Sequence, residues 1–90
     1  MNVTSKRIVV YGAEWCPDAR RSRRLLDEHG VDYQWIDIDR DNRARDFVKQ
    51  ANQGEVRIPL IVFPDESILV EPPNDELSKK LESVFQDPAS

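Results

Sequence analysis

The chain has 90 residues, which is enough for one compact domain but too few for two. Its 39% hydrophobic and 33% charged content, with two Trp, two Tyr and three Phe, is typical of a globular domain and argues against wholesale disorder. The net charge of −4 disfavours nucleic acid and anionic membranes as partners, and no stretch approaches the roughly 20 apolar residues of a membrane span. The start of the chain also lacks the apolar region of a signal peptide. We therefore expect one domain over residues 1–90, with an ordered core over about 6–86, that is cytoplasmic and monomeric.

The chain contains one cysteine, Cys16, and one histidine. A single cysteine excludes an intramolecular disulfide, and this pair cannot supply the Cys-rich ligand set of a structural zinc site, so we predict no metal. Any chemistry of Cys16 is carried out by this thiol alone or together with a partner molecule.

The first predicted strand leads through a short loop into the first predicted helix. Residues 6–11 are β-branched and aromatic and are followed by Gly12, a pattern typical of a buried strand. The helix covers residues 17–29, because Pro17 suits a first helical position and Gly30 suits the residue after a helix end. It therefore begins directly after Cys16.

A second strand and a second helix follow. Residues 33–39 are rich in aromatic and β-branched side chains and end in a polar cluster. An apolar stripe at helical spacing then predicts an amphipathic helix that ends near Gly54, and its members are Ala44, Phe47, Val48 and Ala51. We assign three aromatic residues to the core: Trp35, Phe47 and Phe63.

The second half is predicted to form a hairpin and a last helix. Strands over residues 60–63 and 67–70 are joined by Pro64-Asp65-Glu66, which is turn chemistry. Asn74 is available as a helix cap, residues 87–90 are expected to fray, and the apolar helix positions are Leu77, Leu81, Val84 and Phe85. The order βαβαββα predicts an α/β fold with a four-stranded mixed sheet and three helices.

The most informative motif is Trp15-Cys16-Pro17-Asp18, which places a thiol at the start of a helix. Unpaired N–H groups and the positive end of the helix dipole stabilise thiolate over thiol, so such a cysteine becomes a good nucleophile. Arg20 adds positive charge one turn later, whereas the carboxylate of Asp18 favours the neutral thiol. The alternative is that Cys16 is simply a small buried hydrophobe.

Other residues near this motif also have two interpretations. Trp15 is either a platform beside the thiol or a packing residue. His29 lies about three turns from Cys16, which argues against a general-base role. Four arginines of the same helix either attract an anionic thiol or an acidic protein partner, or form a solvated helix face: Arg20, Arg21, Arg23 and Arg24.

Several further segments, together with this motif and the order of elements, carry a resemblance to a known family. They are Gly30-Val31-Asp32-Tyr33 leading to Asp37-Ile38-Asp39, Arg57-Ile58-Pro59 before the third strand, and Asn74-Asp75-Glu76-Leu77 at the last helix. With them the chain resembles the glutaredoxins, which have the thioredoxin fold, over nearly its whole length. Within that family it is most similar to the bacterial mycoredoxin-like branch, because of the Trp before the Cys, Asn42-Arg43-Ala44 and the Pro72-Pro73 approach to the last helix.

The resemblance implies a thiol–disulfide oxidoreductase whose site is built around Cys16. Arg57-Ile58-Pro59 stands where the family carries Thr-Val-Pro, so the resemblance implies a cis Ile58–Pro59 bond and an Ile58 backbone turned toward the thiol to pair with a ligand. Asp75 and Glu76 are either ligand-binding groups or ordinary residues of a helix start.

Departures from the family pattern define the expected mechanism. Ala19 replaces the second cysteine of Cys-x-x-Cys, which leaves monothiol chemistry on mixed disulfides between proteins and a low-molecular-weight thiol. Ala13 replaces a common Lys, and Pro72-Pro73 replaces Gly-Gly, so the small thiol stays open between a mycothiol-like compound and glutathione. Iron–sulfur cluster binding and a non-catalytic binding module are the alternative hypotheses.

Overall fold

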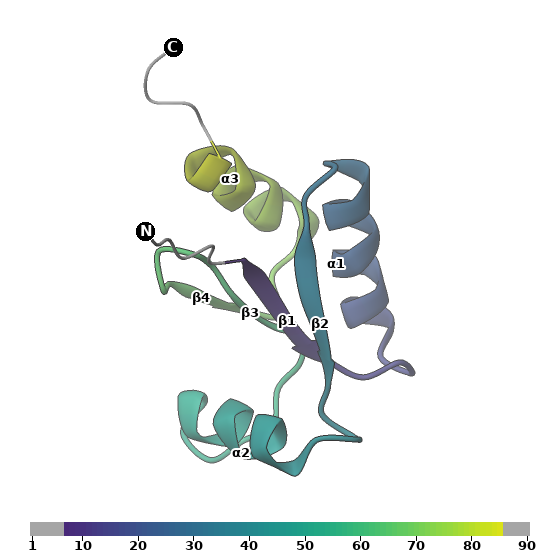
Figure 1. Cartoon of the computed structure of the whole chain (residues 1–90), viewed down its shortest axis with the longest axis vertical. Coiled ribbons are helices and arrows are strands. Elements are labelled where there is room, and N and C mark those ends of the chain that lie inside the picture. The colour runs from purple at the N-terminus through teal and green to yellow at the C-terminus, as the bar shows by residue number, and fades with distance from the viewer. Residues whose placement is uncertain (1–6, 86–90) are drawn as a thin grey trace, which may run out of the picture.

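The structure is a computed structural model that describes residues 7–85, and its elements follow the predicted order βαβαββα (Figure 1). In chain order they are β1 (Ile8–Gly12), α1 (Pro17–Glu28), β2 (Tyr33–Asp37), α2 (Asn42–Ala51), β3 (Leu60–Val62), β4 (Ile68–Val70) and α3 (Asn74–Phe85). Lys6, which we assigned to the first strand, and residues 87–90, which we expected to fray, lie outside the described residues.

The four strands form the predicted mixed sheet, and their order in it is β2-β1-β3-β4. β1 pairs in parallel with β2 and antiparallel with β3, and β3 pairs antiparallel with β4 in the predicted hairpin. Val10 of β1 lies beside Trp35 of β2 and Ile61 of β3. Because β1 and β2 run in parallel, the segments that follow them leave the sheet at the same edge.

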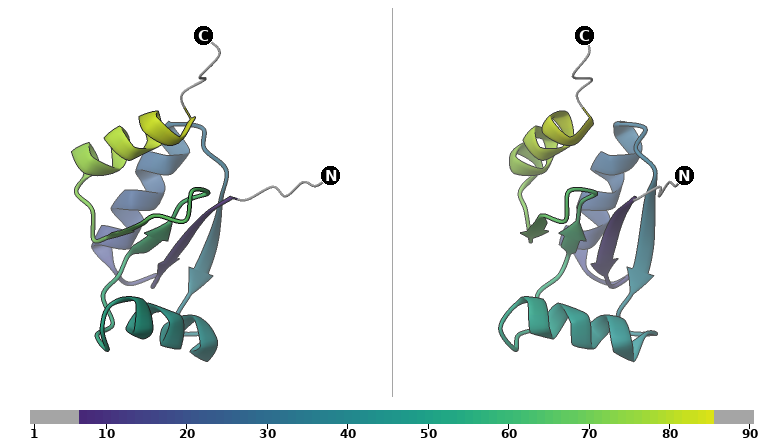
Figure 2. Two further views of the ribbon diagram at one scale, coloured as in Figure 1. Left: turned by 90° about the vertical axis from the view of Figure 1, so that its left-hand side faces the viewer. Right: turned by 60° about the vertical axis from the view of Figure 1, so that its left-hand side comes forward.

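Alternating side chains along the strands build a core on each face of the sheet. On one face, residues of β1 and β3 pack against α1 and α3, and the buried members are Ile8, Val10, Leu26, Ile61, Phe63, Leu77 and Leu81. On the other face the sheet packs against α2 through Ile38, Ala44, Val48 and Leu60. Figure 2 shows α1 and α3 together, with α2 on the opposite side. The result is a layered α/β fold.

The core assignment is confirmed for Phe63 and corrected for Phe47. Phe63 is 2% exposed and Trp35 is half-buried, but Phe47 is 39% exposed. The short helix α2 contacts the sheet through Ala44 and Val48, so Phe47 lies at the margin of the interface, where its ring packs beside Tyr11 with 4.9 Å between ring centroids. Burial, and secondly the charge of Asp41, raises the pKa of the Tyr11 phenol, which stays neutral at physiological pH.

Two predicted element ends are also corrected. Asn74 is the first residue of α3 and not its cap, because the Pro73 carbonyl already accepts a hydrogen bond from the Leu77 N–H at 3.0 Å. β2 ends at Asp37, where the carboxylate accepts a hydrogen bond from the Asp39 N–H at 2.9 Å and turns the chain. The side chain of Phe85 falls outside the described part of the structure. No helix within residues 7–85 is long and apolar enough to cross a membrane.

Candidate active site

Cys16 lies where the loop after β1 enters α1. It is the N-cap residue, with the extended backbone conformation φ −81°, ψ 115°, and Pro17 follows at the first helical position. Its carbonyl accepts the first helical hydrogen bond, from the Arg20 N–H at 3.1 Å, but its side chain makes no capping bond. The thiol therefore lies at the positive end of α1, where unpaired N–H groups of the first turn are available to a negative charge.

The thiol is enclosed by residues from distant parts of the chain. Cys16 is 7% exposed and packs with Ala13 and Ala19, against which Trp35 and Ile58 lie. Its Sγ is 3.9 Å from the Ile58 carbonyl oxygen, a long and weak hydrogen bond across 42 residues of sequence. The antiparallel pairing of β1 and β3 brings these two segments together.

The peptide bond between Ile58 and Pro59 is cis, as the family resemblance implied, and the Ile58 carbonyl faces the thiol. Pro59 is buried, and its carbonyl accepts a hydrogen bond from the Glu71 N–H at 2.8 Å. Arg57, just before the cis bond, lies 3.4 Å from a Glu55 oxygen and 3.7 Å from a Glu71 oxygen. The loop that faces Cys16 is thus held to the segment that leads into α3.

Close packing of an aromatic ring supports the base of this site. A Cβ added at Gly12 would lie 2.8 Å from Cη2 of Trp35 and 3.0 Å from Cβ of Ala19, so only glycine fits here without a shift. The Arg23 guanidinium lies over the same ring, 4.0 Å from its centroid. Arg23 is further held by the Tyr33 hydroxyl at 3.3 Å and by a Glu14 oxygen at 3.6 Å.

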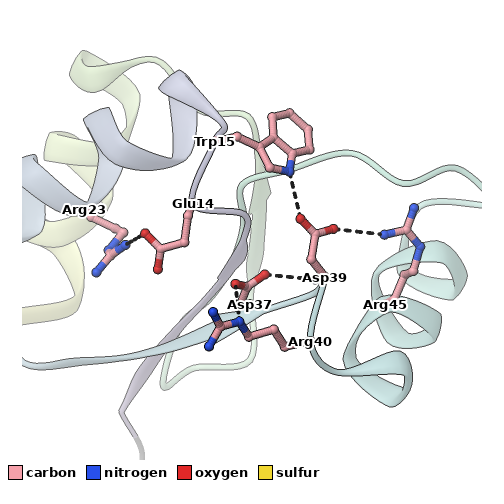
Figure 3. Close-up of polar contacts among 7 residues, drawn as sticks. All are labelled: Glu14, Trp15, Arg23, Asp37, Asp39, Arg40 and Arg45. Atoms are coloured by element: carbon pink, nitrogen blue, oxygen red, sulfur yellow. Dashed lines mark hydrogen bonds and ion pairs between the residues drawn. The ribbon is translucent and has the colours of Figure 1, made fainter.

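Trp15 is 67% exposed, yet its indole is fixed in place (Figure 3). Nε1 donates a hydrogen bond to Oδ2 of Asp39 at 2.8 Å, and the other oxygen of that carboxylate lies 3.6 Å from Nη1 of Arg45. Trp15 therefore presents an exposed ring next to the thiol and is not a core residue. Sequence reasoning missed Asp39, although the parallel pairing of the first two strands brings residues that follow each of them to one edge.

The charged residues of α1 have unequal surroundings. Asp18, which was expected to oppose the thiolate, has its own counter-ion, because Oδ1 lies 3.1 Å from Nη1 of Arg21. The side chains of Arg20 and Arg24 are exposed and form no hydrogen bond or ion pair within residues 7–85. These two side chains line a shallow depression on the outer surface of α1, together with Arg23 and Asp27.

Asp75 and Glu76 are exposed in the first turn of α3. Oδ1 of Asp75 accepts a hydrogen bond from the Glu76 N–H at 2.8 Å, and no hydrogen bond or ion pair of the described residues joins either side chain to the segment around Cys16. His29 follows α1, where Nδ1 lies 3.0 Å from the Leu25 carbonyl oxygen. The structure thus brings Cys16, with its neighbour Trp15, to the Ile58–Pro59 segment, and within residues 7–85 no polar contact links the acidic pair to them.

Comparisons with known proteins agree with this geometry. Residues 8–68 match the family described as Glutaredoxin. Mycoredoxin 1 of Corynebacterium glutamicum is 31% identical over 77 residues, which cover 86% of this chain and 95% of that protein. The fold matches a thioredoxin-like protein with one substitution, at a TM-score of 0.73, 23% identity and coverage of 83% of this chain and 99% of the other. It also matches the buckwheat glutaredoxin–glutathione complex, with a TM-score of 0.65, 21% identity and coverage of 86% and 69%.

Proposed function

Since the chain belongs to the glutaredoxin family, we propose that it is a monothiol thiol–disulfide oxidoreductase whose nucleophile is Cys16. The observation that carries this proposal is the position of Cys16 as the N-cap of α1, opposite the cis Ile58–Pro59 bond. Ala19 lies one turn after Cys16, where a second cysteine would be needed for an internal disulfide.

The proposed cycle has two exchange steps. In the first, the Cys16 thiolate attacks the small-thiol sulfur of a protein mixed disulfide, forms a disulfide with the small thiol, and releases the protein thiolate, which takes up a proton. In the second, the thiolate of another small-thiol molecule attacks the small-thiol sulfur on Cys16. This step releases the disulfide of two small thiols and regenerates the Cys16 thiolate. The net reaction converts one mixed disulfide and one molecule of free small thiol into the protein thiol and the disulfide of the small thiol.

Residues around Cys16 offer contacts to the two molecules that bind in this cycle, the protein mixed disulfide and the small thiol. The Ile58 backbone faces the thiol and offers polar groups to the peptide-like part of a bound disulfide, and the exposed ring of Trp15 offers it an apolar wall. Pro17 sets the helix start, and Arg20 supplies positive charge one turn from Cys16. Asp75 and Glu76 stay candidate ligand groups that a longer molecule has to reach from Cys16.

The small thiol is proposed to be mycothiol-like or glutathione. The sequence similarity to mycoredoxin 1 supports a mycothiol-like compound, and the similarity in fold to a glutaredoxin bound to glutathione supports glutathione. Mass spectrometry of the protein isolated under thiol trapping distinguishes them by the mass added to Cys16. In the proposed cycle the adduct maps to Cys16 and disappears on treatment with a reductant.

Activity is tested with Cys16→Ser in a mixed-disulfide reduction assay. We expect the turnover of this variant to fall to the rate of the uncatalysed exchange. A matched control, Cys16→Ser with Ser22→Cys, returns a thiol to a buried position of the same helix and should stay inactive. Equal rates for wild type and Cys16→Ser would leave a non-catalytic binding module as the function.

The monothiol step is tested separately with Ala19→Cys. The wild type should accumulate its small-thiol adduct when the regenerating thiol is withheld. In the variant, the second thiol can attack Cys16 and release the small thiol as an internal disulfide forms, so the adduct should be lost. Loss of the adduct from wild type at the same rate would contradict a monothiol cycle.

A further inference from the structure

Two arginines of α1, the helix that begins after the proposed nucleophile, are exposed and form no ion pair among the described residues. Of the four arginines in this helix, Arg21 is paired with Asp18, and Arg23 is held against Trp35. Arg20 and Arg24 are exposed and line one shallow depression together with Arg23 and Asp27, so three guanidinium groups face one carboxylate there. The structure therefore separates the arginines that support the fold from those that are free to bind something else.

The placement of Arg20 and Arg24 does not help the helix. They are four residues apart and so lie on one face, where like charges destabilise a helix. Arg20 is also close to the positive end of α1, where the helix dipole favours acidic residues. In a chain with a net charge of −4, this pair forms a local positive surface beside Cys16. A bound carboxylate would offset both unfavourable effects.

The spacing along α1 indicates how far such a ligand extends. With a rise of about 1.5 Å per residue, Arg24 lies roughly 12 Å from Cys16 along the helix axis. An extended polypeptide spans about 3.3 to 3.6 Å per residue, so about three or four residues bridge this length. A small thiol bonded to Sγ would face the Ile58 loop, whereas Arg20 and Arg24 follow a line leading away along the outer face of the helix.

We propose that Arg20 and Arg24 form a docking surface for the protein half of the mixed disulfide, and that this half is an acidic segment. Carboxylates within about two to four residues of the substrate cysteine would reach the two guanidinium groups while Sγ attacks the disulfide. This inference rests on the proposed function, because it takes the direction of the bound polypeptide from the reaction at Cys16.

The test compares two peptides, each carrying a glutathione mixed disulfide. One has glutamates at the second to fourth positions from its cysteine, and the other has glutamines there. We expect wild type to have a higher kcat/KM for the acidic peptide, with a preference that decreases as salt is added. Arg20→Gln and Arg24→Gln should each reduce the acidic-to-neutral ratio about two- to five-fold, the size of an exposed ion pair.

Lys49→Gln is the matched control, because it removes one exposed charge at the far end of α2 (Figure 1). It should leave the ratio unchanged, while Arg24→Glu should favour the neutral peptide. Equal kcat/KM for the two peptides in wild type would overturn the docking proposal and leave the proposed function intact. If neither peptide is turned over, fluorescence anisotropy measures the binding of each peptide to Cys16→Ser. Binding of the acidic peptide alone, weakened by adding Arg24→Gln, supports the docking proposal. Equal binding of the two peptides overturns it.

Discussion

Gly12→Ala tests whether close packing of Trp35 holds the base of the site. The added methyl group would lie 2.8 Å and 3.0 Å from two atoms of the indole, and 3.0 Å from Cβ of Ala19. The indole cannot bend away as a flexible side chain would, and the Arg23 guanidinium lies over it, 4.0 Å from the ring centroid. Relief therefore requires a shift of β1, of α1 or of the whole ring.

Two effects of opposite sign determine the expected magnitude. Overpacking of a well-filled core typically costs about 1 to 3 kcal/mol. Replacing glycine by alanine at a compatible backbone position stabilises by about 0.4 to 1 kcal/mol through the unfolded state. We expect overpacking to win, with a net loss of about 1 to 2 kcal/mol in the free energy of unfolding. For a domain of this size, this corresponds to a decrease in Tm on the order of 4 to 16 °C.

Urea unfolding of wild type, Gly12→Ala, Trp35→Phe and the double variant forms a double-mutant cycle. Phe lacks the distal ring atoms that the methyl group would contact, so Gly12→Ala should cost less in the Trp35→Phe background, by about 1 kcal/mol. The m-value should stay constant across the cycle. An equal cost in both backgrounds, or a stabilised Gly12→Ala protein, would refute the packing argument.

Three further changes test other contacts. Ser22→Ala removes a fully buried hydroxyl that has no hydrogen-bond partner within residues 7–85, so we expect chemical denaturation to give a gain of about 1 kcal/mol in unfolding free energy. Hydrogen bonds from Lys80, and then from Ser67, hold the pKa of Asp65 well below its ordinary value. A carboxylate whose pKa is lower in the folded state than its unfolded value of about 3.9 stabilises the fold above that value, and this stabilisation is lost as pH falls. The difference in unfolding free energy between wild type and Asp65→Asn should therefore be smaller at pH 2 than at pH 7. Asp39→Ala should shift the Trp15 Nε1–H resonance in NMR spectra and speed its solvent exchange, and an unchanged resonance would contradict the 2.8 Å bond.

The sequence predicted the order and type of the elements because its periodicities are clear. Gly12 and Pro17 mark the end of β1 and the start of α1, and Pro64-Asp65-Glu66 marks the hairpin. Helical periodicity indicated the apolar face of α2, but not how much of that face the sheet covers, so the exposure of Phe47 was not predicted. The first residue of α3 depends on the backbone path after Pro72 and Pro73. For this reason the prediction that Asn74 caps the helix was wrong.

The site was predictable where it depends on local sequence. Pro17 places Cys16 at a helix N-terminus, but an X–Pro bond has only about a 5% chance of being cis, so that feature of Ile58–Pro59 came from the family resemblance alone. Helical spacing did not show which arginines of α1 are held by an ion pair or an aromatic ring and which are not. The partners of Arg23 lie in β2 and in the loop before Cys16, and only the folded sheet brings them together.

The strand order also bears on how the protein resists aggregation. The two outer strands of the sheet, β2 and β4, have five and three residues, so little unpaired backbone is open to a second chain. β4 ends at Val70, and the next residue, Glu71, has a positive φ of 50° and donates its N–H to the Pro59 carbonyl. Asp32 precedes β2, Asp37 is its last residue, and each is ion-paired with an arginine, so charged side chains stand at both ends of this edge strand. The arrangement that presents the thiol beside the sheet therefore also limits edge-to-edge association of the chain with itself.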